Sequence, residues 1–135
     1  MSRTRTVGEI MTANPISVAD TASLAEAARI LDSRRITGLP VVDASGALVG
    51  VLSQTDLVRV RASQQLSSSW LGLPVGQIMT TPALTIDVTA SLEEAARVMQ
   101  DRRVHRLVVT GPATTPIGII STSDIFRSLV RSSDD

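Results

Sequence analysis

Cysteine, lysine and tyrosine are absent from the 135-residue sequence, and histidine occurs only once. Without cysteine there can be no disulfide and no thiolate metal site, and one histidine is too few for a multi-histidine zinc site. The missing lysine and tyrosine exclude Schiff-base chemistry, a phosphate-loop lysine and acid–base catalysis by tyrosine. Few groups are left that could carry a reaction, and we expect neither a bound metal nor a required cofactor.

Aromatic residues and net charge are also scarce. Trp70 and Phe126 are the only aromatic residues, and 13 arginines balance 13 acidic residues. Sequence-independent binding of nucleic acid needs a positive field and stacking rings, so it is not expected here. No apolar run reaches the length of a membrane span, and the N-terminal segment lacks the apolar core of a secretory signal. We therefore expect a cytoplasmic protein.

The most informative feature is an internal repeat. Residues 7–60 align without a gap with residues 75–128, with 21 identities in 54 positions. Two copies are too few for a solenoid, which needs three or more. We predict two similar half-domains related by a pseudo-twofold axis, with motifs at 7–60 and 75–130 and a Ser- and Gln-rich linker at 61–74. At this length the two halves should form one coupled module.

Each copy has the pattern of a β-α-β-β-α unit. Ser23-x-x-Glu26 and Ser91-x-x-Glu94 are typical of capping boxes, and apolar residues follow them at helical spacing. A second helix is expected to start near Ser53 or Ser121, after two further apolar stretches. The predicted strands are Ile16–Val18, Leu39–Val42 and Leu48–Leu52 in the first copy, and Leu84–Ile86, Arg106–Thr110 and Ile117–Ile120 in the second. We predict an α+β sandwich in which two such motifs pack through their sheets.

A seven-residue motif recurs where the last strand of each copy should turn into a helix. Gly50–Asp56 and Gly118–Asp124 both read Gly, two apolar residues, Ser, any residue, Ser or Thr, and Asp. Ser-x-x-Asp alone can be a capping box with a purely structural role. A capping box does not need the second hydroxyl, which belongs to Thr55 or Ser123. Both a structural and a ligand-binding interpretation are open.

A nucleoside phosphate would suit these groups. The free N–H groups and the positive dipole end of a helix N-terminus favour phosphate, and neighbouring hydroxyls can donate to its oxygens. A carboxylate repels phosphate but accepts hydrogen bonds from two adjacent ribose hydroxyls. The candidate ligand-binding residues are Ser53, Thr55 and Asp56 in the first copy and Ser121, Ser123 and Asp124 in the second.

The second copy also contains a cationic pair, His105-Arg106, where the first has Thr37-Gly38. On a structural interpretation His105 is hydrogen-bonded at the start of a strand and Arg106 is a solvated charge. If a phosphate lies nearby, Arg106 becomes its natural bidentate partner.

With these residues in view, the repeat resembles a tandem of cystathionine β-synthase (CBS) motifs, the unit called a Bateman module. The segments that carry the resemblance are Val7–Thr12, Ile36–Asp43 and Gly50–Leu57 in the first copy and Val104–Val109 and Gly118–Ile125 in the second. The resemblance implies a regulatory module rather than an enzyme. It implies adenosine ligands (AMP, ADP, ATP or S-adenosylmethionine) in two clefts between the repeats.

The resemblance also implies a role for each candidate residue. It implies that the two aspartates hold ribose, that the four hydroxyls lie on the phosphate side, and that His105 and Arg106 contact phosphate. Because Thr37-Gly38 replaces that cationic pair in the first copy, occupancy of the two clefts is expected to differ. Family members commonly form homodimers through their helices. The apolar residues available for such an interface are Leu57, Val58, Ile125, Phe126, Leu129 and Val130.

Three functions remain open from the sequence. The first is an adenine-nucleotide sensor that regulates a separate partner protein. The second is a protein-interaction module without a ligand. The third is an enzyme, for which the single histidine offers no evident nucleophile or metal partner.

Overall fold

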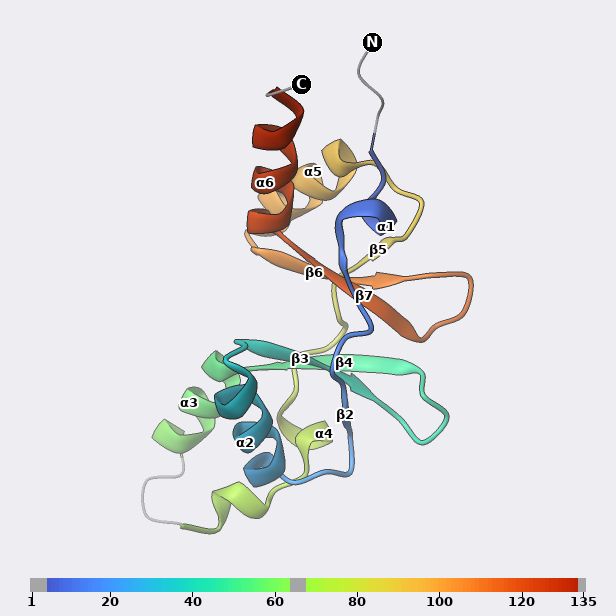
Figure 1. The fold of residues 1–135 in the computed structure, drawn as a ribbon. Coiled ribbons are helices and arrows are strands. Elements are labelled where there is room, and N and C mark those ends of the chain that lie inside the picture. The colour runs from blue at the N-terminus through green and yellow to red at the C-terminus, as the bar shows by residue number, and fades with distance from the viewer. Residues whose placement is uncertain (1–4, 64–67, 134–135) are drawn as a thin grey trace. The chain divides into compact units, whose positions relative to one another are not determined.

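The computed structural model describes residues 5–63 and 68–133, whose course is shown in Figure 1. The chain forms two compact units, each with its own sheet and core. Ile16–Ala83 make up one, which we call the continuous unit; Met1–Pro15 and Leu84–Asp135 make up the other, the discontinuous unit. Each unit combines helices with a mixed sheet, which confirms the predicted α+β class.

The continuous unit has a three-stranded sheet with the order β2-β3-β4. Strand β2 lies parallel to β3, and β3 runs antiparallel to β4. In chain order the elements are β2 (Val18–Ala19), α2 (Leu24–Arg34), β3 (Gly38–Val42), β4 (Leu48–Ser53), α3 (Gln54–Ser63), the 3-10 helix η1 (Ser68–Gly72) and α4 (Val75–Ile78).

The discontinuous unit has a four-stranded sheet with the order β1-β7-β6-β5. Strand β5 lies parallel to β6, while β7 runs antiparallel to both β6 and β1. In chain order the elements are α1 (Val7–Ile10), β1 (Thr12–Ala13), β5 (Thr85–Asp87), α5 (Leu92–Arg102), β6 (Arg106–Thr110), β7 (Pro116–Ser121) and α6 (Thr122–Ser133).

Serine caps begin the first long helix of each repeat, as the sequence predicts. The Ser23 hydroxyl accepts a hydrogen bond from the Glu26 N–H at 3.1 Å, and the Ser91 hydroxyl accepts one from the Glu94 N–H at 3.0 Å. These bonds satisfy donors that the first helical turn would otherwise leave unpaired. Both helices end at an arginine in the left-handed conformation, which stops further helical hydrogen bonding.

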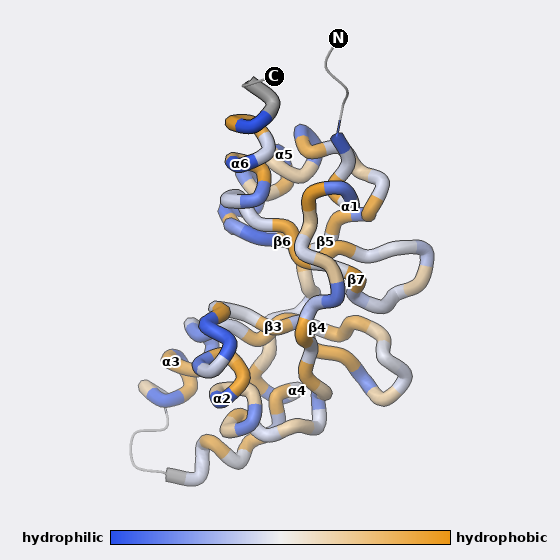
Figure 2. The backbone as a smooth tube through the Cα atoms, in the orientation of Figure 1, coloured by the Kyte–Doolittle hydropathy of each residue, from blue (hydrophilic) through white to orange (hydrophobic). Residues whose placement is uncertain are grey.

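Each unit has its own apolar core, and Figure 2 shows how largely apolar the central strands β3 and β6 are. In both strands three successive residues are buried, and successive side chains of a strand point to opposite faces of the sheet. The largest fully buried side chains are Leu24, Leu39, Val41, Leu52 and Val75 in the continuous unit and Val7, Leu107, Val109 and Ile120 in the discontinuous unit. None of the described helices combines the length and the apolar character needed to cross a membrane.

Each repeat begins with a short segment that we call its head, Val7–Thr12 in the first repeat and Val75–Thr80 in the second. Each head packs into the unit that contains the rest of the other repeat. In the continuous unit the Val75 N–H donates to the Ala22 carbonyl at 2.8 Å, and in the discontinuous unit the Val7 N–H donates to the Ala90 carbonyl at 2.8 Å. Both valine side chains are fully buried. The compact units therefore differ from the repeats as they run along the sequence.

The predicted order β-α-β-β-α is found in both units, as β2-α2-β3-β4-α3 and β5-α5-β6-β7-α6. Strand β6 has the predicted bounds, Arg106–Thr110. The first strand of the first copy lies at Val18–Ala19 rather than Ile16–Val18, and Ile16 is 36% exposed. The short elements α1, β1, η1 and α4 were not predicted.

The predicted linker, 61–74, contributes structure to the continuous unit. It contains the end of α3 and the whole of η1. Trp70 and Leu73 pack against the core of that unit. Residues 64–67 of this segment lie outside the described residues.

Candidate functional site

Each unit contains a junction where its last strand passes directly into a helix, β4–α3 in the continuous unit and β7–α6 in the discontinuous unit. At β4–α3, the Ser53 hydroxyl accepts from the Asp56 N–H at 3.2 Å, and Asp56 Oδ2 accepts from the Ser53 N–H at 2.9 Å. At β7–α6, the matching bonds between Ser121 and Asp124 measure 3.1 Å and 2.8 Å. Both motifs are thus capping boxes.

Asp56 is buried, with 3% of its surface exposed, and both its oxygens are engaged. Oδ2 accepts from the Ser53 hydroxyl at 3.1 Å as well as from the Ser53 N–H. Oδ1 accepts from Arg59 Nη1 at 3.2 Å and from the Thr80 hydroxyl at 3.0 Å. A buried carboxylate needs such donors to remain charged at low cost.

Asp124 is buried to a similar degree, at 8% exposed, but fewer of the described residues donate to it. Oδ2 accepts from the Ser121 N–H, and Oδ1 accepts from Arg127 Nη2 at 2.6 Å. The Arg127 side chain is 57% exposed, so its ion pair with Asp124 is partly screened by water. Asp124 therefore keeps acceptor capacity that a ligand hydroxyl can use.

The second hydroxyl of each motif stands outside the capping box. Thr55 and Ser123 occupy the second position of their helices, and both side chains are exposed. Each lies in the first turn of its helix, where the N–H groups on either side already donate within the protein: those of Gln54 and Asp56 in one unit, and those of Thr122 and Asp124 in the other. A hydroxyl in that position can donate to an anionic oxygen.

The structure brings His105 and Arg106 to the same junction as the second motif. Arg106 is the cross-strand partner of Ser121, and the His105 carbonyl accepts from the Thr122 N–H at 2.8 Å. Both side chains are exposed. One end of the discontinuous unit thus gathers the predicted residues His105, Arg106, Ser121, Ser123 and Asp124.

The continuous unit has the same backbone arrangement at its junction, with Gly38 at the position that Arg106 occupies in the other unit. Gly38 is the cross-strand partner of Ser53, and the Thr37 carbonyl accepts from the Gln54 N–H at 2.9 Å. Ser53, Thr55 and Asp56 gather here. The predicted residues therefore form two groups, one in each unit.

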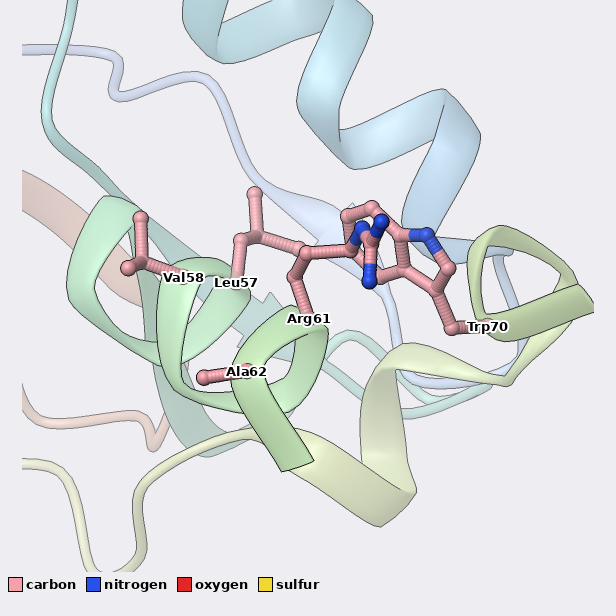
Figure 3. A pocket seen from close by; sticks show the side chains of 5 residues that line it. All are labelled: Leu57, Val58, Arg61, Ala62 and Trp70. Carbon is pink, nitrogen blue, oxygen red and sulfur yellow. The ribbon is translucent and has the colours of Figure 1, made fainter. Parts of the chain in front are cut away.

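An open pocket beside α3 shares no lining residue with either group. Leu57, Val58, Arg61, Ala62 and Trp70 line it. Figure 3 shows Leu57 and Arg61 extending from α3 towards Trp70. This lining is apolar apart from one guanidinium and the indole N–H, and it contains none of the predicted ligand-binding residues. Hydroxyls and carboxylates for a ribose are found at the junctions and not in this pocket.

Both copies match the family model of the CBS domain, the first at residues 7–63 and the second at residues 75–131. Together these ranges cover most of the chain. The protein belongs to the CBS domain family, as a tandem pair. The resemblance read from the sequence is confirmed.

Known CBS proteins, two of them with solved structures, resemble the pair over almost its whole length. The chloroplastic CBS domain-containing protein CBSX1 of Arabidopsis thaliana is 30% identical over 93% of this chain. The match spans 64% of CBSX1, which is less than two-thirds of that relative. A crystal structure of CBSX2 of Arabidopsis thaliana in complex with AMP has 33% identity and a TM-score of 0.83, covering 95% of this chain and 98% of that one.

A second solved structure is a CBS domain pair of protein MJ0100 in complex with 5'-methylthioadenosine and S-adenosyl-L-methionine. It has 26% identity and a TM-score of 0.83, and the match covers 96% of this chain and 98% of that one. Both structures share the fold described above for each unit.

Three residues of the CBS pair that contact the motif aspartates escaped the sequence analysis. Arg59 and Arg127 each follow an aspartate by three residues, a spacing that brings side chains together on a helix. That spacing recurs in both copies and could have identified them. Thr80 reaches Asp56 from 24 positions away, and nothing local in the sequence indicates that contact.

Proposed function

We propose that this CBS pair is a regulatory module that binds an adenosine compound and acts on a separate partner protein, without catalysis of its own. The ligand class is AMP, ADP, ATP or S-adenosylmethionine, and the AMP complex of CBSX2 supports that choice. One observation carries the proposal. A buried carboxylate, a helix start with two serines, and Arg106 converge at one end of the discontinuous unit.

Each group has a task that follows from its chemistry. Asp56 and Asp124 accept hydrogen bonds from ribose hydroxyls, because carboxylates offer several acceptor positions. The hydroxyls of Thr55, Ser121 and Ser123 donate to phosphate oxygens beside the helix starts, while the Ser53 hydroxyl donates to Asp56 Oδ2 and holds the carboxylate that accepts the ribose. Arg106, with His105 next to it, provides the positive charge that pairs with phosphate.

The two sites differ in their affinity for phosphate. The second copy supplies Arg106, whereas the first has Gly38 at the matching position. A hydrogen bond between charged groups contributes about 1.5–3 kcal/mol, which corresponds to roughly ten- to a hundredfold in affinity. The site containing Asp124 is therefore the tighter one for AMP, ADP or ATP.

Titration calorimetry with AMP and with adenosine tests the assignment. Arg106→Ala should weaken AMP binding roughly ten- to a hundredfold and leave adenosine binding almost unchanged, because only the phosphate contact is lost. Asp124→Ala should weaken both ligands, because both contain ribose. Arg131→Ala is the matched control, since it removes an exposed arginine from the last turn of α6 and should change neither.

Equal losses of AMP and adenosine binding in Arg106→Ala would show that Arg106 is structural. If AMP, ATP and S-adenosylmethionine all fail to bind or to raise the melting temperature of the wild type, the nucleotide proposal is wrong. The pair would then be an interaction module without a ligand.

We also propose that the protein is a homodimer. Helix α6 alternates between apolar and polar residues in Figure 2, and one of its faces is exposed although apolar. Phe126 is 63% exposed, Leu129 62% and Val130 44%, whereas Ile125 on the other face is buried in the core. Adjacent exposed apolar side chains of this kind favour association with a second copy.

Light scattering at micromolar concentration tests the homodimer. The wild type should have twice the chain mass, and Phe126→Ser with Leu129→Ser should shift it towards the monomer. Arg131→Ala on the same helix is the control and should remain dimeric. A monomeric wild type would contradict the proposal.

A further inference from the structure

We propose that Thr80 sets the affinity of the Asp56 site for ribose by competing for the carboxylate, an inference that rests on the proposed nucleotide function. A carboxylate has about four positions at which it can accept a hydrogen bond. Asp56 already has four donors: the Ser53 N–H and hydroxyl on Oδ2, and Arg59 and the Thr80 hydroxyl on Oδ1. Adjacent ribose hydroxyls need two acceptor positions, so they must displace donors.

The four donors differ in how easily they can leave. The Ser53 N–H and hydroxyl belong to the cap of α3, and the same hydroxyl also accepts from the Asp56 N–H. Losing the N–H bond would break the capping box, and the hydroxyl is half-buried and fixed in place by the Asp56 N–H that it accepts. The Arg59 side chain is 70% exposed and can turn into solvent at little cost. The second position must therefore come from Thr80.

The backbone holds Thr80 beside Asp56. Thr80 and Val51 exchange two backbone hydrogen bonds, of 2.8 Å and 3.0 Å. A Cβ on Gly50 would lie 2.9 Å from the Thr80 carbonyl oxygen, so this approach requires glycine. The Thr80 side chain is itself exposed. Its hydroxyl can therefore leave Asp56 for water while the backbone stays in place.

The equivalent threonine of the other unit does not compete in this way. Thr12 lies on β1 and pairs with Ile119, as Thr80 pairs with Val51. Within the described ranges, however, the donors to Asp124 are the Ser121 N–H and Arg127, and Thr12 is not among them. Asp124 thus keeps about two acceptor positions for a ribose. The two sites thus differ in the number of donors around the ribose-binding carboxylate, as well as in the presence of Arg106 on the phosphate side.

Titration with adenosine, which lacks phosphate, isolates the ribose contribution. The Asp56 site is measured in the Asp124→Ala background and the Asp124 site in the Asp56→Ala background. Thr80→Val removes the hydroxyl but keeps the branched shape, and it should tighten adenosine binding at the Asp56 site about three- to tenfold. Thr12→Val is the matched control and should leave the Asp124 site unchanged. Thr80→Ser retains the hydroxyl and should behave like the parent.

The outcomes separate this inference from the nucleotide function. Failure of the wild type to bind adenosine or AMP at all would contradict the nucleotide function. If the wild type binds but Thr80→Val leaves the Asp56 site unchanged or weakens it, the competition by Thr80 is wrong. A melting curve of each variant verifies folding, and Asp124→Asn replaces Asp124→Ala if the latter does not fold.

Discussion

The two oxygens of each motif aspartate have different neighbours. Oδ2 of Asp56 and of Asp124 accepts from the backbone of the serine that caps the helix, while Oδ1 accepts from an arginine one turn further along. A ligand hydroxyl that replaces the arginine at Oδ1 leaves the cap intact. One carboxylate can therefore serve the fold and the proposed site at the same time.

Ser128 on α6 is a residue whose hydroxyl costs stability. It is 4% exposed, and its Oγ has no hydrogen-bond partner among the described residues. A buried donor without a partner costs about 1–3 kcal/mol. Ser128→Ala should therefore raise the free energy of unfolding by about 1 kcal/mol in a urea titration.

Ser63→Ala is the control for that measurement. The Ser63 hydroxyl is exposed and donates to the Val60 carbonyl, so the change should stay within about 0.5 kcal/mol. A Ser128→Ala variant that is less stable than the wild type would mean that the hydroxyl finds a partner in solution.

At the scale of single elements, the turn between β3 and β4 depends on a charged side chain. Asp43 Oδ1 accepts from the Ser45 hydroxyl at 2.6 Å and from the N–H groups of Ser45 and Ala47. The Ser45 hydroxyl and these backbone groups hold the pKa of the Asp43 carboxyl below its usual value of 3.8. A carboxyl with a lowered pKa stabilises the folded state above its unfolded pKa and loses that effect as the pH falls through the folded pKa.

Asp43→Asn should therefore lower the melting temperature slightly at neutral pH, and the difference from the wild type should disappear in acid. Ser45→Ala removes the strongest of these bonds and should bring the pKa of Asp43, followed by NMR, closer to its usual value. A difference between wild type and Asp43→Asn that persists unchanged in acid would show that the charge plays no part.

Glycines in β4 and β7 let the repeat heads lie against the sheets. A Cβ on Gly118 would lie 3.0 Å from the Thr12 carbonyl oxygen and would overlap the Met11 sulfur, and a Cβ on Gly50 would lie 2.7 Å from the Met79 sulfur. Gly118→Ala and Gly50→Ala should each lower the free energy of unfolding by about 1–3 kcal/mol. Urea denaturation measures this. Gly72→Ala, with no atom within 4 Å of its added Cβ, is the control and should be nearly neutral.

The sequence predicted the longer elements well because their signals are local. Serine caps identified the starts of α2 and α5, and turn residues separated the strands of each hairpin. The alignment of the two repeats includes both heads, but it does not show that they form α1, α4 and β1. Elements of two to four residues are too short to have a recognisable hydrophobic period. Their positions depend on partners far along the chain, such as Ala90 for Val7. For the same reason Thr80 could not be assigned to Asp56.

At the scale of the whole molecule, each core is completed by the other repeat's head. The core of the continuous unit includes Val75, which is fully buried and belongs to the second repeat. A fragment cut at Ile16–Ala83 contains this core whole, whereas one cut at residues 1–68 contains the first repeat but lacks Val75.

The fragment of residues 16–83 should therefore unfold cooperatively in urea, and the fragment of residues 1–68, which has the same length, should not. Circular dichroism and chemical denaturation of the two compare them directly. If both unfold alike, the exchanged head contributes little to the core.

The exchanged heads also affect the order of events while the chain is being synthesised. The continuous unit is complete once Ala83 has been made. The head Val7–Thr12 packs on residues that follow Leu84, so it cannot reach its native position until they have been made. Domains generally fold as they emerge, starting from the N-terminus. The head of the first repeat, Val7–Thr12, differs from the head of the second, Val75–Thr80, only in having Glu9 in place of Gln77. Until the second head has been made, the first head is therefore a competing segment for the position that α4 takes in the continuous unit. The acidic side chain of Glu9 is what distinguishes this competitor from the correct segment.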